Sequence, residues 1–181
     1  MTTHQDAPGQ AMLRQWERAQ AVPWGRWLFM LMVRRMVPYT GALGSRMVEL
    51  RPGLARVELD DRRGVRNHLG SIHAVALVNL GEFAGGMAML TALPPGVRGI
   101  VTRLEAEYLK KARGRLSAVG EAAPPEVDGE EEFRVATRIT DADGDVVAVV
   151  TATWNLRRSA GQRGVGETPG GGSTPPGGSA S

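Results

Sequence analysis

The chain contains no cysteine, few aromatic residues and no strong excess of one charge. The absence of cysteine excludes disulfides, thiolate catalysis and the common zinc sites, and it is compatible with a reducing compartment. We therefore expect a cytoplasmic protein. Aromatic residues make up 5% of the 181 residues, and the formal net charge is +3. This mildly basic balance lacks the concentrated Lys/Arg stripe that is typical of nucleic-acid binding, so no nucleic-acid partner is expected.

Long hydrophobic runs are also missing. The first eight residues are mostly polar, which does not fit a secretory signal. The most apolar stretch, Trp24 to Val37, is interrupted by Arg26, Arg34 and Arg35. It is also shorter than the about 20 apolar residues that a helix needs to cross a bilayer. We therefore expect a soluble protein without a membrane span.

Composition divides the chain into three regions. Residues 159–181 are rich in Gly, Pro, Ser and Thr, and we expect them to be disordered. Residues 1–43 predict an N-terminal helical extension, interrupted at Pro23 and ended by Pro38. One apolar stripe of this extension consists of Trp27, Leu28, Leu31, Met32 and Met36. We expect the stripe to pack against the main domain, with an acyl-chain pocket or a membrane surface as alternatives.

Residues 44–158 predict one α+β domain. Period-two patterns and turn dipeptides such as Asp143-Gly144 indicate the strands, while a long apolar segment suits a buried helix. The predicted strands are 45–50, 54–59, 99–109, 115–121, 133–140 and 145–156, and the predicted helix is 72–90. The last strand is apolar on both faces, which indicates a central rather than an edge position. We expect a long central helix wrapped by a largely antiparallel sheet.

The beginning of this helix and one residue inside it could take part in catalysis. Ser71 is the expected N-cap, which would leave the Ala74 N–H without an intrahelical acceptor. Such an end can stabilise an oxyanion forming on a carbonyl. Glu82 stands in apolar company, where burial would raise its pKa and suit it to general-base chemistry. About 12 Å of helix separates the two, so a shared site needs Ala74 of one subunit and Glu82 of another.

The same residues carry a family resemblance. Asn67, the pair His73-Ala74 and Glu82 resemble the signature of hotdog-fold acyl-CoA thioesterases, which is an Asn, a His-Gly pair and an acidic residue in the central helix. The spacing is similar to that of the phenylacetate-degradation branch. Over residues 44–158 the chain looks most similar to a bacterial hotdog domain of unknown function. Ala74 and Glu82 depart from the Gly and Asp of the closest spacing match, and Val101 stands where some relatives have Ser.

The resemblance implies a hotdog fold and hydrolysis of an acyl-CoA or related acyl thioester by a homodimer or a dimer of dimers. The Ala74 amide would donate to the oxyanion, Asn67 and His73 would orient the thioester or a water, and Glu82 would be the base or the nucleophile. The expected substrate-binding residues are Gly70, Thr102 and Arg113. No cofactor and no metal are expected.

Several alternatives stay open from the sequence. The chain could be a non-catalytic hotdog module that binds acyl-CoA or lipid, which the departures at Ala74 and Val101 permit. Hydration of an enoyl thioester is less favoured, because the Asp/His dyad of such proteins is not found at its spacing. His73 could only cap the helix, Asn67 could only form a turn, and Glu82 could be a structural acid.

A group of basic residues follows the same segments of the chain. It consists of Arg62, Arg63, Arg66, Lys110, Lys111, Arg113 and Arg115. These side chains could meet the phosphates of coenzyme A, or they could form the ordinary charged surface of a soluble protein.

Overall fold

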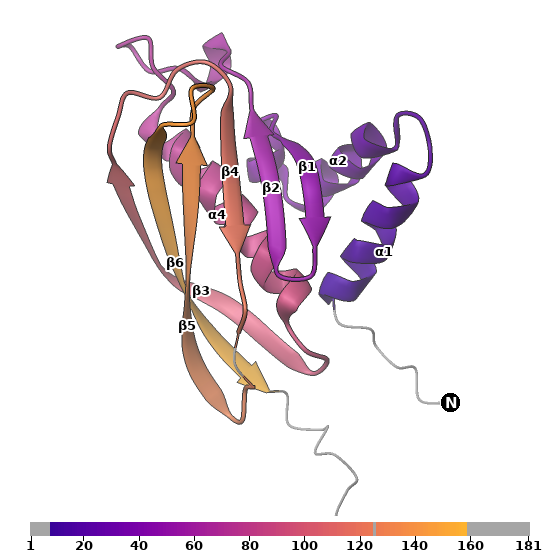
Figure 1. The fold of residues 1–181 in the computed structure, drawn as a ribbon. Coiled ribbons are helices and arrows are strands. Elements are labelled where there is room, and N and C mark those ends of the chain that lie inside the picture. The colour runs from indigo at the N-terminus through magenta and orange to yellow at the C-terminus, as the bar shows by residue number, and fades with distance from the viewer. Residues whose placement is uncertain (1–7, 125, 159–181) are drawn as a thin grey trace, which may run out of the picture.

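The computed structural model describes residues 8–124 and 126–158, and the segment predicted to be disordered, 159–181, lies outside them (Figure 1). The elements in chain order are α1 (Pro8–Gln20), α2 (Gly25–Met36), α3 (Pro38–Ala42), β1 (Arg46–Arg51), β2 (Leu54–Leu59), a short 3-10 helix (Arg63–Val65), α4 (Ala74–Ala92), β3 (Val97–Tyr108), β4 (Leu116–Glu121), β5 (Glu130–Thr140) and β6 (Val146–Arg158). The prediction of an α+β fold with a long central helix and an antiparallel sheet is confirmed.

The six strands form one antiparallel sheet in the order β1-β2-β4-β5-β6-β3. The last strand, β6, lies between β5 and β3, as its two apolar faces predicted. Among the described strands the edges are β1 and β3, and β3 pairs with β6 alone. The register of β3 shifts between Val101 and Arg103, so Thr102 lies at an irregularity of this edge strand.

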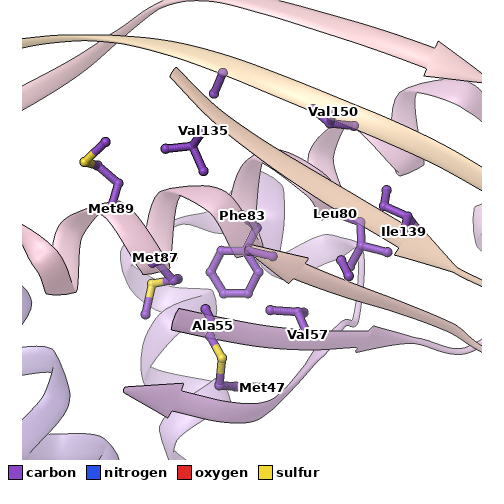
Figure 2. Packing of buried hydrophobic residues seen from close by; sticks show 14 of the residues in the cluster. Met47, Ala55, Val57, Leu80, Phe83, Met87, Met89, Val135, Ile139 and Val150 are labelled. Carbon is purple, nitrogen blue, oxygen red and sulfur yellow. The ribbon is translucent and has the colours of Figure 1, made fainter. Parts of the chain in front are cut away.

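Helix α4 packs along the concave face of the sheet (Figure 1). Leu80 and Phe83 are buried on it, against strand residues that include Val57 and Ile139 (Figure 2). Burial of each such side chain stabilises the fold by about 1.5–3 kcal/mol. The helix approaches the sheet closely at Gly81, where an added Cβ would stand 2.5 Å from the Cβ of Val150. The glycines of the predicted helix therefore allow close approach to the sheet.

Helix α4 is the one helix within residues 8–124 and 126–158 that is long and apolar enough to cross a membrane. Most of its apolar stretch, 67%, is buried inside the protein. This burial is what the core helix of a sheet-wrapped domain requires, so the length and composition are weak evidence for a span.

The N-terminal region differs from its prediction in two ways. Pro38 ends α2, but it also begins the short helix α3, because proline is well suited to the first position of a helix. The stripe that contains Trp27 and Leu31 was expected to face the core, and this was wrong. Phe29 and Val33 are buried instead, while Trp27 and Leu31 are exposed. Apolar residues lie on both sides of α2, so periodicity could not distinguish the inner from the outer face.

Candidate functional site

Helix α4 begins at Ala74, and its N-cap is His73 rather than the predicted Ser71. The Nδ1 atom of His73 accepts the backbone N–H of Val75 at 3.2 Å. Ser71 is drawn away from the helix because its N–H and hydroxyl both donate to the side chain of Asn67. An imidazole nitrogen therefore satisfies one of the free N–H groups at the start of the helix.

The amide of Ala74 is the group at this helix end that could meet a substrate. Within residues 8–124 and 126–158 it donates to no acceptor, and Ala74 itself is exposed. Its carbonyl accepts from the hydroxyl of Tyr108 on β3 at 3.4 Å. The prediction of a free N–H at Ala74 is confirmed even though the expected cap was wrong, because both caps place Ala74 in the first turn. A free donor on the positive end of a buried helix can stabilise developing negative charge.

Asn67 organises the loop before the helix. Its Oδ1 accepts from the N–H groups of Leu69 and Ser71, at 2.9 and 3.2 Å, and from the Ser71 hydroxyl at 3.3 Å. Its backbone N–H donates to the Ser71 carbonyl at 2.8 Å. The turn role that was open from the sequence is therefore present, and in the described part of the chain the side-chain NH₂ has no partner and stays available.

Two hollows flank the start of α4. One, of about 360 Å³, is lined by residues that include Asn67, Ala74, Tyr108 and Lys111. The other, of about 310 Å³, lies between α3 and α4, and its lining includes His73. The structure thus brings Asn67 and Ala74 to one hollow and places His73 on the neighbouring one.

Glu82 lies on α4 two turns after Ala74, and it is partly buried. Burial raises the pKa of its carboxyl above the ordinary value of 4.5. Among the described residues no group donates a hydrogen bond to this carboxylate. Its Oε1 and the Cζ2 of Trp154 each stand 3.6 Å from where a Cβ of Gly86 would be. A partly buried carboxyl that receives no hydrogen bond from the described residues is in the state expected of a general base or of an acid that meets a partner subunit.

None of the three expected substrate-binding residues is among the described residues that line the two hollows, although Gly70 lies in the loop of Asn67. Gly70 forms a turn with φ +69°, and its N–H donates to the Asn67 carbonyl. Thr102 donates its hydroxyl to the carbonyl of Thr153 at 3.3 Å. Arg113 is exposed in the loop after β3, where its charge helps to lower the pKa of Asp61, although the Arg66 hydrogen bond is the main cause. A role of these residues toward a substrate stays a prediction.

Four of the seven basic residues expected near phosphates are engaged within the chain. Arg66 pairs with Asp61, Arg115 with Asp60, and Lys110 with both Asp141 and Asp145. The guanidinium of Arg62 donates to carbonyls of α3 and the residue after it. Arg63, Lys111 and Arg113 remain without a carboxylate partner in the described part of the chain, and Lys111 lines the hollow of Ala74.

Two polar groups near the site were missed from the sequence. The indole N–H of Trp154 is buried without an acceptor among the described residues, on the strand that faces Glu82. Asn79 on α4 donates to the hydroxyl of Thr40 at 3.3 Å, while its Oδ1 is buried and unpartnered. An asparagine in an otherwise apolar helix is a signal that could have indicated Asn79. Trp154 carried no such signal, because tryptophan suits a central strand.

Comparison with known proteins supports this architecture. A family model described as "Domain of unknown function (DUF4442)" matches residues 25–156. A search of curated proteins finds no match. The crystal structure of a protein called APC5556 is 31% identical with a TM-score of 0.72, and the match covers 83% of this chain and 98% of that one.

Two further solved structures carry thioesterase names. The Pseudomonas aeruginosa protein PA5026, a protein of unknown function described as a probable thioesterase, is 26% identical with a TM-score of 0.61, covering 69% of this chain and 90% of that one. A thioesterase family protein from Silicibacter pomeroyi is 19% identical with a TM-score of 0.58, covering 72% and 96%, and its likeness concerns the fold alone. The chain therefore belongs to the DUF4442 family, whose domain has the hotdog fold of thioesterases.

Proposed function

We propose that the protein hydrolyses an acyl thioester, with acyl-CoA as the substrate class. The observation that carries this proposal is the amide of Ala74, which has no acceptor among the described residues and lies at the exposed start of a buried helix, in a hollow that Asn67 also lines. The description of PA5026 as a probable thioesterase supports the reaction class. The absence of cysteine suits a cytoplasmic location, which we also propose.

The reaction would use two groups that stand about 12 Å apart on one helix. The carboxylate of Glu82 would take a proton from water as that water attacks the thioester carbonyl. The Ala74 N–H would stabilise the oxyanion that forms. Collapse of this intermediate would break the C–S bond, and Glu82 would return the proton to the leaving thiolate. Direct attack by the carboxylate is the other route open to this residue.

A second copy of the chain would bring the two groups together. The free edge of β3 can pair with the same strand of a partner, and Leu104 and Tyr108 are exposed on the helix-facing side of that strand. Val75 at the start of α4 is exposed beside them. Pairing of the two β3 edges would set the α4 helices side by side and place Ala74 of one subunit near Glu82 of the other. We therefore propose a homodimer or a dimer of dimers as the active form.

A binding module without turnover is the second candidate function. It is favoured because two groups that could position a water already form hydrogen bonds within the chain. The Oδ1 of Asn67 accepts within its loop, and the hydroxyl of Thr102 donates to β6. The Asn67 Oδ1 already accepts three hydrogen bonds, and the Thr102 hydroxyl has no hydrogen left to donate to a water.

The test is release of free thiol from a panel of acyl-CoAs by the wild type and by Glu82→Gln. We expect turnover by the wild type and a loss of about a hundredfold or more in the variant, the scale of a removed acid–base group. Glu121→Gln is the matched control, because Glu121 is exposed at the end of β4 and its carboxylate has no interaction with any described residue. A folded dimer that binds acyl-CoA but releases no thiol at any chain length would refute hydrolysis and favour the binding module.

A further inference from the structure

Helix α2 presents an apolar face to solvent. Trp24, Trp27, Leu28 and Leu31 are all exposed, and their spacing places them on one side of the helix. The exposed fractions of the two tryptophans are 83% and 63%, so neither ring is used in the core. A helix that is apolar on both faces is expected to be covered on both faces. The described chain covers only the inner one.

The apolar surface continues beyond this helix. Met36, Val37 and Tyr39 are exposed where α2 gives way to α3, and Tyr39 is 71% exposed. A hollow of about 600 Å³ opens between α2 and β1, and its lining includes Met30 and Met47. This surface lies beside β1, whereas the proposed catalytic dimer would use β3 at the opposite edge of the sheet (Figure 1). Both faces can therefore be occupied at the same time.

The charged residues of α2 are all basic, and the one carboxylate among the described residues that line the hollow, Glu58, pairs with Arg46. No aspartate or glutamate occurs from Arg18 to Val48. Arg26, Arg34 and Arg35 of α2 have no carboxylate partner in the described part of the chain, although Arg26 also lies over the ring of Trp16.

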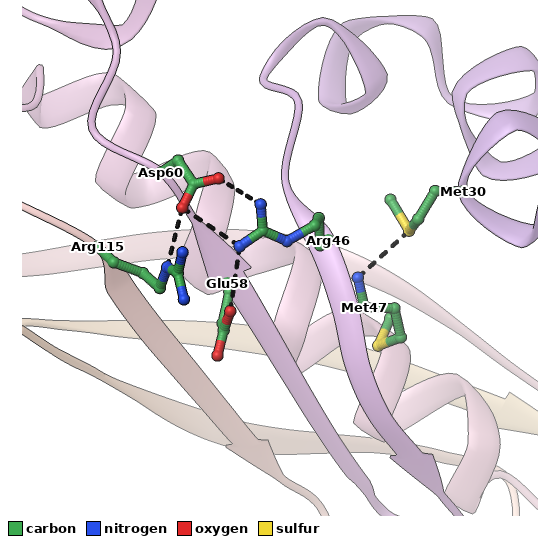
Figure 3. A network of polar contacts seen from close by, with 6 residues as sticks. All are labelled: Met30, Arg46, Met47, Glu58, Asp60 and Arg115. Atoms are coloured by element: carbon green, nitrogen blue, oxygen red, sulfur yellow. Dashed lines mark hydrogen bonds and ion pairs between the residues drawn. The ribbon is translucent and has the colours of Figure 1, made fainter. Parts of the chain in front are cut away.

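A neighbouring arginine, in contrast, is neutralised by carboxylates of the chain. Arg46 on β1 is held by the carboxylates of Asp60 and Glu58 (Figure 3). The unpaired guanidinium groups of α2 are thus a local feature and not the rule for this edge of the sheet.

Trp24 adds an independent observation. Its φ is +68°, the one positive φ of a residue other than glycine in the described part of the chain. Glycine adopts this conformation without the steric cost that a side chain adds. A large, exposed side chain on a strained backbone contributes little to the stability of the fold, so we expect it to contact a binding partner.

We propose that the exposed face of α2, with Met36, Val37 and Tyr39, docks on an anionic lipid surface. Tryptophan, leucine and arginine on one face are the composition of helices that lie in the bilayer interface. A second copy is the less favoured occupant, because pairing this face with itself would bring Arg34 and Arg35 of both copies together. The charges complement a lipid headgroup of opposite sign instead. This surface binding does not depend on the proposed hydrolysis.

The test is co-sedimentation of the full chain with vesicles of phosphatidylcholine containing phosphatidylglycerol, compared with phosphatidylcholine alone. We expect binding to the anionic vesicles, weakened by salt. Arg34→Gln with Arg35→Gln should lower the partition coefficient about fivefold for each arginine. Trp27→Gln with Leu31→Gln should abolish binding while leaving the thermal transition in place, because both side chains are exposed.

A matched control changes the same charge elsewhere. Arg98→Gln with Arg138→Gln alters exposed arginines of β3 and β5, and this variant should bind like the wild type. Equal losses in the control and in the α2 variants would overturn the proposal. The proposal would also be overturned if the wild type stayed in the supernatant and the variant Trp27→Gln with Leu31→Gln formed a smaller oligomer than the wild type. That outcome would assign the face to a second copy.

Discussion

Replacement of Ala74 by proline removes the proposed oxyanion donor and little else. Proline has no N–H, and Ala74 occupies the first position of α4, where proline is favoured in helices. The preceding residue must then be extended, and His73 already has φ −65° and ψ 140°. Ala74 is exposed and its amide has no acceptor in the described chain, so no internal hydrogen bond is lost. We therefore expect the free energy of unfolding to change by less than about 1 kcal/mol.

The rate should respond far more than the stability. Loss of one oxyanion donor lowers kcat by about 10²–10³-fold in known acyl-transfer sites. Thiol release from acyl-CoA at saturating substrate would measure kcat, and thermal unfolding of the same preparation would confirm the fold. Ala74→Gly is the matched control, since it keeps the N–H, and its activity should stay within a few fold of the wild type. If the proline variant is folded and retains the wild-type kcat, the Ala74 amide is not the oxyanion donor.

Three further predictions concern α4. Gly81→Ala should destabilise the fold by about 1–3 kcal/mol in urea unfolding, because its Cβ would stand 2.5 Å from the Cβ of Val150. Gly86→Ala meets only ordinary contacts at 3.6 Å and should be neutral or stabilising by up to about 1 kcal/mol; equal losses at both positions would contradict the packing. Burial raises the pKa of Glu82, so kcat should rise with pH through a value above 4.5, and an acid limb at or below 4.5 would argue against this base. Because the pKa of Glu82 is raised in the folded protein, its ionised form destabilises the fold. Glu82→Gln should therefore raise the melting temperature near pH 7, and this gain should vanish below pH 4.5. Thermal unfolding at several pH values would test this.

The elements of the domain could be predicted because their signals are local. Period-two patterns indicated the strands, the long apolar segment indicated the central helix, and Asp143-Gly144 marked the hairpin that joins β5 to β6. The free amide of Ala74 and the partial burial of Glu82 followed from the same segment, since each depends on its position along one helix. The family signature added the expected fold and left the roles of these residues to be tested.

Tertiary contacts decided what local patterns could not express. Asn67 binds Ser71 and so takes it from the helix, which leaves His73 as the N-cap. Lys110 is held by carboxylates more than thirty positions away, so its availability to a phosphate could not be judged from the nearby sequence. Helix α2 is apolar on both sides, and only packing against the domain determined that Phe29 is buried and Trp27 is exposed. Sequence periodicity gives the conformation of a segment, whereas the choice of face and partner depends on which distant residues lie beside it.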